Sequence, residues 1–241
     1  MLKVLSLILG ISLFFNAYAE EFVIERSYST TFVKTNKNCT LAKYKKICLG
    51  YINFLAGRFE NSQLQRFNAD IDYEDNLAII DIPHATQKLS VDFRPVSKIN
   101  LITIITHVET EDVLGKDNFI ETVNFNEETV KMISFKDLFE KPQVASLLCA
   151  RKLEEKFARN NTELFPLVVA SIEVNPSRFL ILPDGIEFVF PPNLVEKSNK
   201  DSVLTVKAEE LIEAGPKLEW FPEFKSRNAD SMVDPILGEN K

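Results

Sequence analysis

Residues 99–108 read Ile-Asn-Leu-Ile-Thr-Ile-Ile-Thr-His-Val, and this stretch decides the fold class. Its β-branched and apolar side chains are typical of a buried strand, so we expect it inside a sheet. Residues 89–93 and 119–125 flank it and alternate apolar with polar side chains, which indicates half-buried strands. Helical segments lie before and after this group, so the sequence predicts an α+β fold.

The remaining elements follow from periodicity and from turn residues. Strands are expected over residues 21–34, 77–82, 130–133, 179–182, 186–190 and 203–206. The two main helices are expected over residues 41–59 and 142–159, with a shorter helix over residues 208–214 that ends at Gly215. Asp184 and Gly185 connect two of the strands, and this pair predicts a tight hairpin because glycine accommodates a positive φ.

Composition limits the possible functions. The chain has 241 residues, of which 45% are hydrophobic and 26% charged, and this is typical of a folded protein with one large domain or two small ones. The net charge of −7 argues against a broad basic face, so no nucleic-acid partner is expected.

The first 19 residues have the features of a secretory signal peptide. Lys3 precedes an apolar run over residues 4–15, and Ala17-Tyr18-Ala19 forms a small-x-small cleavage site. The run is shorter than the ~20 residues that a spanning helix needs, so we expect cleavage after Ala19 and no membrane span in the mature chain. The predicted location is the periplasm or the exterior. The net charge then becomes −8, because residues 1–19 contain one lysine and no acid.

Export would place the three cysteines in oxidising conditions. Cys39 and Cys48 are the expected disulfide, although one continuous helix would hold them ~13 Å apart, so the pairing requires a bend between them. Cys149 is then a buried thiol. The alternative pairs Cys48 with Cys149 and leaves Cys39 free.

No catalytic, metal or cofactor motif stands out. Neither His84 nor His107 has zinc-ligand spacing, and the serines lack the contexts of known nucleophiles. On a strand, His107, Glu109 and Glu111 would share one face, which could be a weak metal patch, but an acidic strand end is the better interpretation. We therefore expect no metal site, no cofactor and no enzyme activity.

The segments 124–126, 133–139 and 178–190 carry a family resemblance. They read Asn-Phe-Asn, Ile-Ser-Phe-Lys-Asp-Leu-Phe and Arg-Phe-Leu-Ile-Leu-Pro-Asp-Gly-Ile-Glu-Phe-Val-Phe. This succession resembles the DUF3298 family, found in the ectodomain of the anti-sigma-V factor and beside peptidoglycan deacetylases, with a DUF4163-like half before it. The resemblance implies a curved, mainly antiparallel sheet packed by helices. This chain departs from the family pattern at residues 112–118, where relatives carry Gly-Gly-Ala-His.

The expected organisation has four parts. Residues 1–19 form the signal peptide, 20–97 a DUF4163-like half, 98–215 a DUF3298-like half and 216–241 a tail. The aromatic rings of Trp220 and Phe221 either strap this tail to the core or form an exposed anchor for a partner.

Two functions from different classes remain open. The first is an exported, non-catalytic binding module of the bacterial envelope, for which the resemblance implies lysozyme, another envelope protein or peptidoglycan as partner. The second is a small cell-wall or glycan hydrolase with paired carboxylates. For the binding module, an acidic surface suits a cationic partner. The candidate binding residues are Glu109, Glu111, Asp112, Asp117, Trp220 and Phe221.

Overall fold

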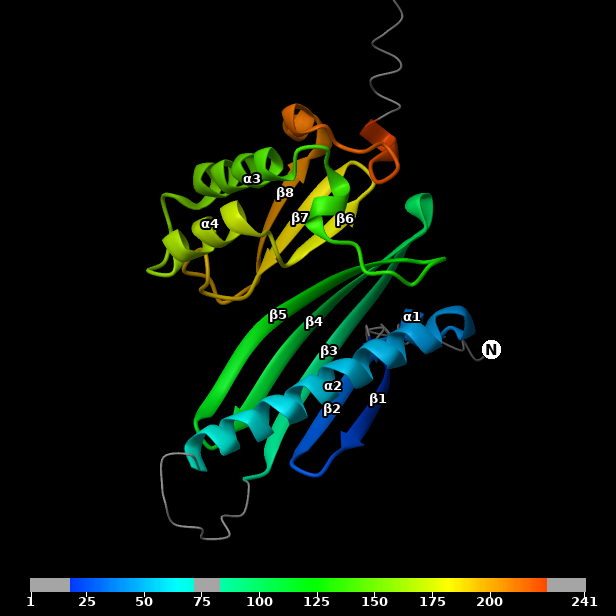
Figure 1. The fold of residues 1–241 in the computed structure, drawn as a ribbon, viewed down its shortest axis with the longest axis vertical. Helices are drawn as coiled ribbons and strands as arrows, with labels where there is room; N and C mark the ends of the chain where they lie inside the picture. The colour runs from blue at the N-terminus through cyan, green and yellow to red at the C-terminus, as the bar shows by residue number, and fades with distance from the viewer. Residues whose placement is uncertain (1–17, 72–82, 225–241) are drawn as a thin grey trace, which may run out of the picture.

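Residues 101–108 of the stretch that decides the fold class lie within a five-stranded sheet, as their composition predicts, whereas Ile99 and Asn100 precede the strand. The structure, a computed structural model, describes residues 18–71 and 83–224. The strands are β1 (Tyr18–Glu25), β2 (Ser29–Asn36), β3 (Ala85–Val96), β4 (Leu101–Asp112) and β5 (Gly115–Asn126), in the order β1-β2-β3-β4-β5. Among these neighbours β2 and β3 pair in parallel, and the others are antiparallel. The sheet is curved, and the predicted fold class is confirmed (Figure 1).

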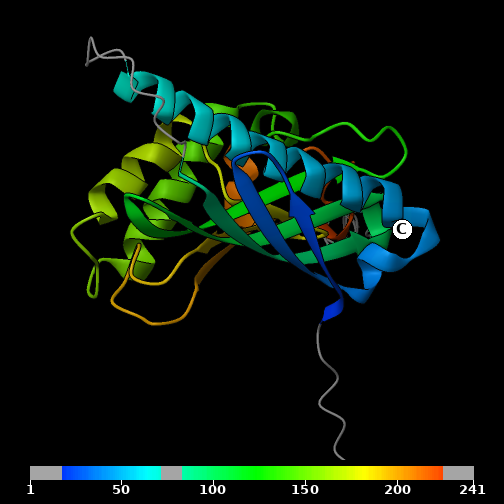
Figure 2. The same cartoon turned by 90° about the horizontal axis from the view of Figure 1, so that it is seen from below.

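One long helix covers one face of this sheet. Helix α2 (Ala42–Ile71) lies across the strands (Figure 2), and its buried side chains recur at helical spacing. They include Cys48, Tyr51, Ile52 and Leu55. These four pack on the α2-facing side chains of the strands, which include Val33, Phe93 and Ile104.

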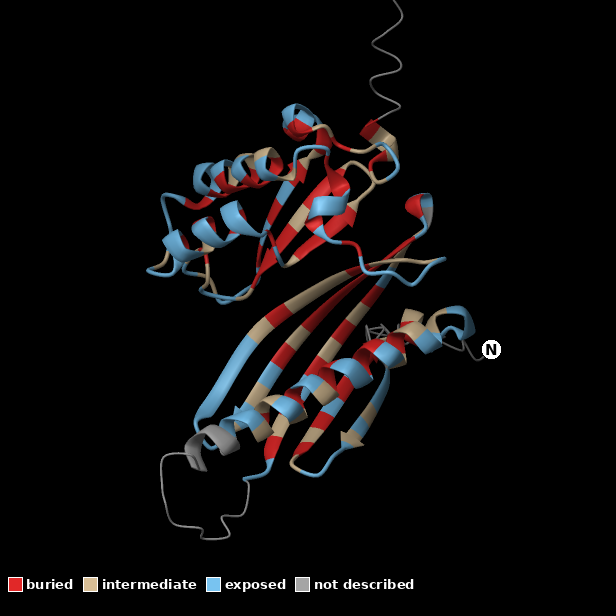
Figure 3. Cartoon of the chain, in the orientation of Figure 1, coloured by how far each residue is buried: buried red, intermediate tan, exposed pale blue. Residues whose placement is uncertain are grey.

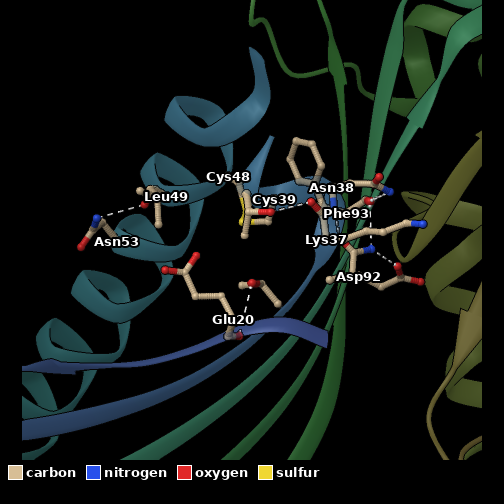
Figure 4. The surroundings of a disulfide bond; sticks show 12 residues. Glu20, Lys37, Asn38, Cys39, Cys48, Leu49, Asn53, Asp92 and Phe93 are labelled. Atoms are coloured by element: carbon tan, nitrogen blue, oxygen red, sulfur yellow. Dashed lines mark hydrogen bonds between the residues drawn. A yellow bond between two sulfur atoms is a disulfide. The ribbon is translucent and has the colours of Figure 1, made fainter. Parts of the chain in front are cut away.

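The disulfide forms at the start of this helix. The short helix α1 (Lys37–Thr40) begins after Asn36, whose side chain accepts a hydrogen bond from the Asn38 N–H (3.2 Å). Leu41 is extended and separates α1 from α2, which brings the Cα atoms of Cys39 and Cys48 to 5.5 Å (Figure 4). The predicted pairing and the predicted bend are both confirmed. Cys149 is free and buried.

A second layer follows in the chain. Strands β6 (Phe179–Leu182), β7 (Gly185–Phe190) and β8 (Ser202–Lys207) form a three-stranded antiparallel sheet. Helices α3 (Pro142–Phe157) and α4 (Phe165–Val174) pack on it, together with the 3₁₀ turn η2 (Phe135–Leu138) and the 3₁₀ helix η3 (Ala208–Ala214) (Figure 1). Both main helices begin within one residue of their predicted starts.

The two sheets meet through few side chains. Ile105 and Ile120 of the large sheet form a small buried cluster with Leu180 and Val189 of the small sheet. The Asn124 side chain also donates to the Phe179 carbonyl (2.9 Å) and accepts from the Ile181 N–H (3.2 Å). These contacts lie on the face of β4 and β5 opposite α2. The expected boundary between residues 97 and 98 falls in η1 (Ser97–Ile99), between two strands that pair in one sheet.

Several expected elements differ from the structure. The single strand expected over residues 21–34 is the hairpin of β1 and β2. Residues 130–133 form one isolated bridge, between Phe125 and Met132, and no strand. Periodicity does not predict helix α4, and α2 continues to Ile71. The strand expected over residues 77–82 and residues 1–17 of the expected signal peptide lie outside the described residues.

The predicted hairpin at Gly185 is confirmed, but glycine is needed there for a reason other than the predicted positive φ. Gly185 does not have a positive φ. A Cβ atom at this position would instead collide with the Val206 carbonyl oxygen of β8. Close approach of the neighbouring strand therefore requires glycine here.

Candidate functional site

A groove runs between α2 and the β4–β5 hairpin, on the side where β5 is the edge of the sheet. Three ion pairs cross it, each from a cation of α2 to an acid of the hairpin or the turn after it. They are Lys43 with Glu127, Arg58 with Glu121, and Arg66 with Asp112 (2.5 Å). These pairs divide the groove into an apolar compartment and a polar compartment. Figure 3 shows α2 and the lower part of β5 with exposed and half-buried residues along this side.

The apolar compartment lies between the first and second ion pairs. It has a volume of ≈ 740 Å³, and it is lined mainly by side chains of α2, β5 and the segment after β5. Three of its apolar side chains are strongly exposed: Phe54 (60%), Val130 (50%) and Met132 (68%). Such a group of exposed apolar side chains around a hollow is typical of an interaction site.

Tyr51 forms the floor of this compartment. Its ring packs edge-on against Phe125, with 6.2 Å between the ring centroids. Burial raises the pKa of the Tyr51 hydroxyl above its ordinary value of 10.0. At the rim, the hydrogen bond to Glu127 raises the pKa of Lys43, so this cation stays charged under all physiological conditions.

The polar compartment lies between the second and third ion pairs and is smaller, at ≈ 200 Å³. Gln63 of α2, Gln87 of β3, and Thr110 and Asp117 of the hairpin line it. The Thr31 hydroxyl donates to the Gln87 side-chain oxygen (3.3 Å), which fixes the direction of this amide. The compartment offers several hydrogen-bonding groups beside the Phe119 ring.

The acidic residues predicted for binding divide between the two faces of the hairpin. Asp117 lines the polar compartment, and Asp112 accepts from Arg66 at its end. Glu109 and Glu111 point to the opposite face, because side chains alternate along a strand. There Glu109 lies 3.9 Å from Lys88, and Glu111 pairs with Lys116 (3.1 Å).

The predicted aromatic residues of the tail lie elsewhere. Phe221 is fully buried, and its ring centroid is 5.7 Å from that of Phe139. Trp220 is partly buried, and its indole N–H donates to the Asp137 carbonyl (3.2 Å). Of the two expected alternatives, the structure therefore shows the one in which these rings hold the tail on the core. Residues 216–224 and the turn that connects β4 to β5 lie at opposite ends of the molecule (Figure 1).

The histidines do not gather with other possible ligands. His84 contacts the Thr30 hydroxyl (2.8 Å), and His107 lies 3.5 Å from Asp201. Within residues 18–71 and 83–224, no group of three or more His, Cys, Asp or Glu side chains could hold a metal ion. No helix in the same ranges is both long and apolar enough to cross a bilayer.

No protein-family model and no curated protein matches the sequence. Two solved structures resemble the fold, one from Bacteroides fragilis and one from Pseudomonas aeruginosa. Both are DUF3298 family structures. The first has a TM-score of 0.45 at 9% identity, and the second a TM-score of 0.49 at 11% identity. In each case the match covers 84% of this chain and 95% of the other. The motif in residues 178–190 resembles the same family.

Sequence reasoning missed the residues of the groove. Arg58 and Arg66 lie eight positions apart on α2, and Phe54 lies near them as an apolar residue outside the buried stripe. The position of Phe54 could have indicated the groove, because an apolar side chain outside the core face of a helix often takes part in binding. The pairing of both arginines with the hairpin could not be read from the sequence.

Proposed function

We propose that this chain is an exported, non-catalytic binding module of the bacterial cell envelope. In this proposal the groove between α2 and the β4–β5 hairpin recognises a protein such as lysozyme or a component of the cell wall. The exposed apolar compartment beside a polar one is the observation that carries the proposal, because the two together offer both buried area and hydrogen bonds.

Two further features support this proposal. The Cys39–Cys48 disulfide fits an extracytoplasmic domain, since disulfides persist in oxidising compartments. The net charge of −7 favours encounter with a cationic partner such as lysozyme.

A hydrolase with paired carboxylates has less support. Asp117 and Glu121 share one face of β5 and line the polar compartment. Four residues along a strand separate their Cα atoms by ~13 Å, so both side chains would have to lean toward each other to reach the carboxyl separation of about 5 to 9.5 Å that glycosidases use. Glu121 is also occupied by Arg58.

The test is a titration of the full chain, exported and processed by a bacterial host, with lysozyme and with purified peptidoglycan fragments. Phe54→Ser and Met132→Ser alter exposed side chains of the groove, so both variants should fold. Leu167→Ser is the matched control, because Leu167 is 68% exposed on α4, outside the groove. We expect binding to fall at least about tenfold in the groove variants and to persist in the control.

Other results would contradict the proposal. Equal binding by the groove variants and the control would remove the groove as the site. Absence of binding to both probes would remove the named partners, and turnover of peptidoglycan would replace the binding module by an enzyme.

A further inference from the structure

Two glutamine side chains occupy core-facing positions around the polar compartment. Gln63 follows Leu55 and Phe59 at four-residue steps along the buried face of α2, and only 9% of its surface is exposed. Gln87 lies on the α2-facing side of β3 and is 4% exposed. Glutamine is mostly found at the surface of proteins, so two buried amides beside one hollow need an explanation.

Most of the hydrogen-bonding capacity of these amides is unused. Within residues 18–71 and 83–224, their only side-chain hydrogen bond is the one that the Thr31 hydroxyl donates to the Gln87 oxygen (3.3 Å). The NH₂ group of Gln87, and both the oxygen and the NH₂ group of Gln63, are therefore available to the compartment that the two residues line. Buried polar groups are nearly always paired, so this unpaired set points to a ligand.

Strand pairing places further polar side chains in one row across the sheet. Thr31 lies opposite Gln87, Gln87 opposite Thr110, and Thr110 opposite Asp117. Side chains that lie opposite one another on neighbouring strands share a face of the sheet. The row therefore presents hydroxyl, amide and carboxylate groups to α2.

An apolar row lies beside the polar one. The next α2-facing positions along the strands are Leu89, Val108 and Phe119, which also lie opposite one another. Val108 and Phe119 line the compartment together with Phe59 of α2. A ligand in the compartment thus meets polar groups along one side and aliphatic and aromatic surface along the other.

The size and the charges of the compartment restrict the ligand further. At ≈ 200 Å³ it is smaller than the pockets of about 300–1,000 Å³ that hold drug-sized ligands, so it admits one small group. The ion pairs of Arg58 and Arg66 bound its two ends, which favours the end of a substituent over a chain that passes through. Between the two buried amides a charged group would find no counterion, so the group is neutral.

We infer that the polar compartment holds the acetamido group of an N-acetylated amino sugar. The carbonyl of this group accepts from the Gln87 NH₂, and its N–H donates to the Gln63 oxygen on the opposite side. Its methyl group contacts the apolar row, and the sugar hydroxyls contact Thr110 and Asp117. Such sugars form the glycan chains of cell walls, so the inference rests on the proposed function and specifies the ligand of the same groove.

The test is an NMR titration of the full chain, exported and processed by a bacterial host, with N,N′-diacetylchitobiose. Cellobiose is the matched probe, because it has the same linkage and carries hydroxyl groups in place of the acetamido groups. We expect the acetylated disaccharide to bind at least about tenfold more tightly than cellobiose, because a site built for an amide rejects a ligand that lacks it.

Gln63→Leu separates a role in binding from a role in the fold. The amide of Gln63 has no hydrogen-bond partner in residues 18–71 and 83–224, so the variant should be at least as stable as wild type in thermal unfolding. It should weaken binding of the acetylated disaccharide at least about tenfold, and Thr110→Val at least about threefold. Gln65→Leu is the matched control, because Gln65 is exposed on the same helix, and it should leave binding unchanged.

Four results would overturn the inference. The first is equal binding of the two disaccharides, and the second is equal binding by Gln63→Leu and Gln65→Leu. A less stable Gln63→Leu that retains binding would show that the amide serves the fold. Tighter binding of Nε-acetyllysine than of the disaccharide would assign the compartment to an acylated protein.

Failure of this inference is distinguishable from failure of the proposed function. If the chain does not bind the disaccharide but binds lysozyme in a manner that depends on Phe54 and Met132, the sugar assignment is wrong and the binding module stands.

Discussion

Arg58 of α2 forms an ion pair with Glu121 of β5, and this pair separates the apolar compartment of the groove from the polar one. The Arg58 side chain is 54% exposed. Water and salt therefore screen the pair, so its role in holding α2 on the sheet is small beside the buried residues of the helix.

Replacing Arg58 should consequently affect the groove more than the stability of the fold. We expect Arg58→Gln to lower the free energy of unfolding by at most about 1 kcal/mol. Urea denaturation followed by circular dichroism measures this difference. A loss of several kcal/mol would show that the pair is a principal support of α2.

The disulfide and the free cysteine give a simple pattern of thiol reactivity. Burial raises the pKa of the Cys149 thiol to about 12, so it should not react in the folded protein at pH 8. A thiol reagent should count no thiol in the native state, one after denaturation and three after denaturation with reduction. With any other pairing of the cysteines, peptide mapping would identify Cys39 or Cys48, in place of Cys149, as the free thiol.

Reduction should also destabilise the fold. The Cys39–Cys48 bridge closes a short loop, for which chain entropy gives about 2–3 kcal/mol. The double variant Cys39→Ser and Cys48→Ser should show a similar loss and should not respond to reductant. Equal stability of the oxidised and reduced wild type would contradict this expectation.

Gly185 and Gly50 should respond in opposite directions to alanine. Gly185→Ala pushes a methyl group into the β8 backbone and should destabilise the protein by about 1–3 kcal/mol. Gly50 lies within α2 with open space around it, so Gly50→Ala should stabilise the protein by about 1 kcal/mol. Thermal and urea unfolding of both variants checks the two signs. If Gly185→Ala left the free energy of unfolding unchanged, β7 and β8 would be able to move apart at this point without loss of stability.

Asp137 should contribute a pH-dependent part of the stability. Its carboxylate accepts from the hydroxyl (2.7 Å) and the N–H (2.8 Å) of Ser134, and the hydroxyl bond is the main reason why the pKa of Asp137 lies below its ordinary value of 3.8. A lowered pKa in the folded state means that the contribution is present above pH 3.8 and is lost as the pH falls through the folded value.

We therefore expect Asp137→Asn to lower the free energy of unfolding by at most about 1 kcal/mol at neutral pH, because water screens this exposed carboxylate, and the difference from wild type should narrow below pH 3.8. Ser134→Ala removes the hydroxyl donor and should show the same trend. Urea unfolding at a series of pH values measures it. A difference that does not change with pH would show that the carboxylate charge is not involved.

Local chemistry was enough to predict much of the fold. The strands around residues 99–108, the helix beginning at Pro142 and the hairpin at Asp184 follow from side-chain periodicity and turn residues. Periodicity predicts one strand in place of the first hairpin because its turn, residues 26–28, contains no glycine, proline, asparagine or aspartate. It misses helix α4 because exposed Leu167 and Val174 obscure the spacing of the buried face.

The sequence by itself determined the α+β class and favoured the Cys39–Cys48 pairing over the Cys48–Cys149 alternative, because both inferences depend on residues close together in the chain. Only the tertiary structure decided which surfaces lie together. The packing of α2 on the five-stranded sheet brings Arg58 to Glu121, and the packing of the second layer buries Phe221 against Phe139. The register of β4 and β5 places Glu109 and Asp117 on opposite faces. These relationships arise from packing between distant segments, which side-chain periodicity along the chain does not encode.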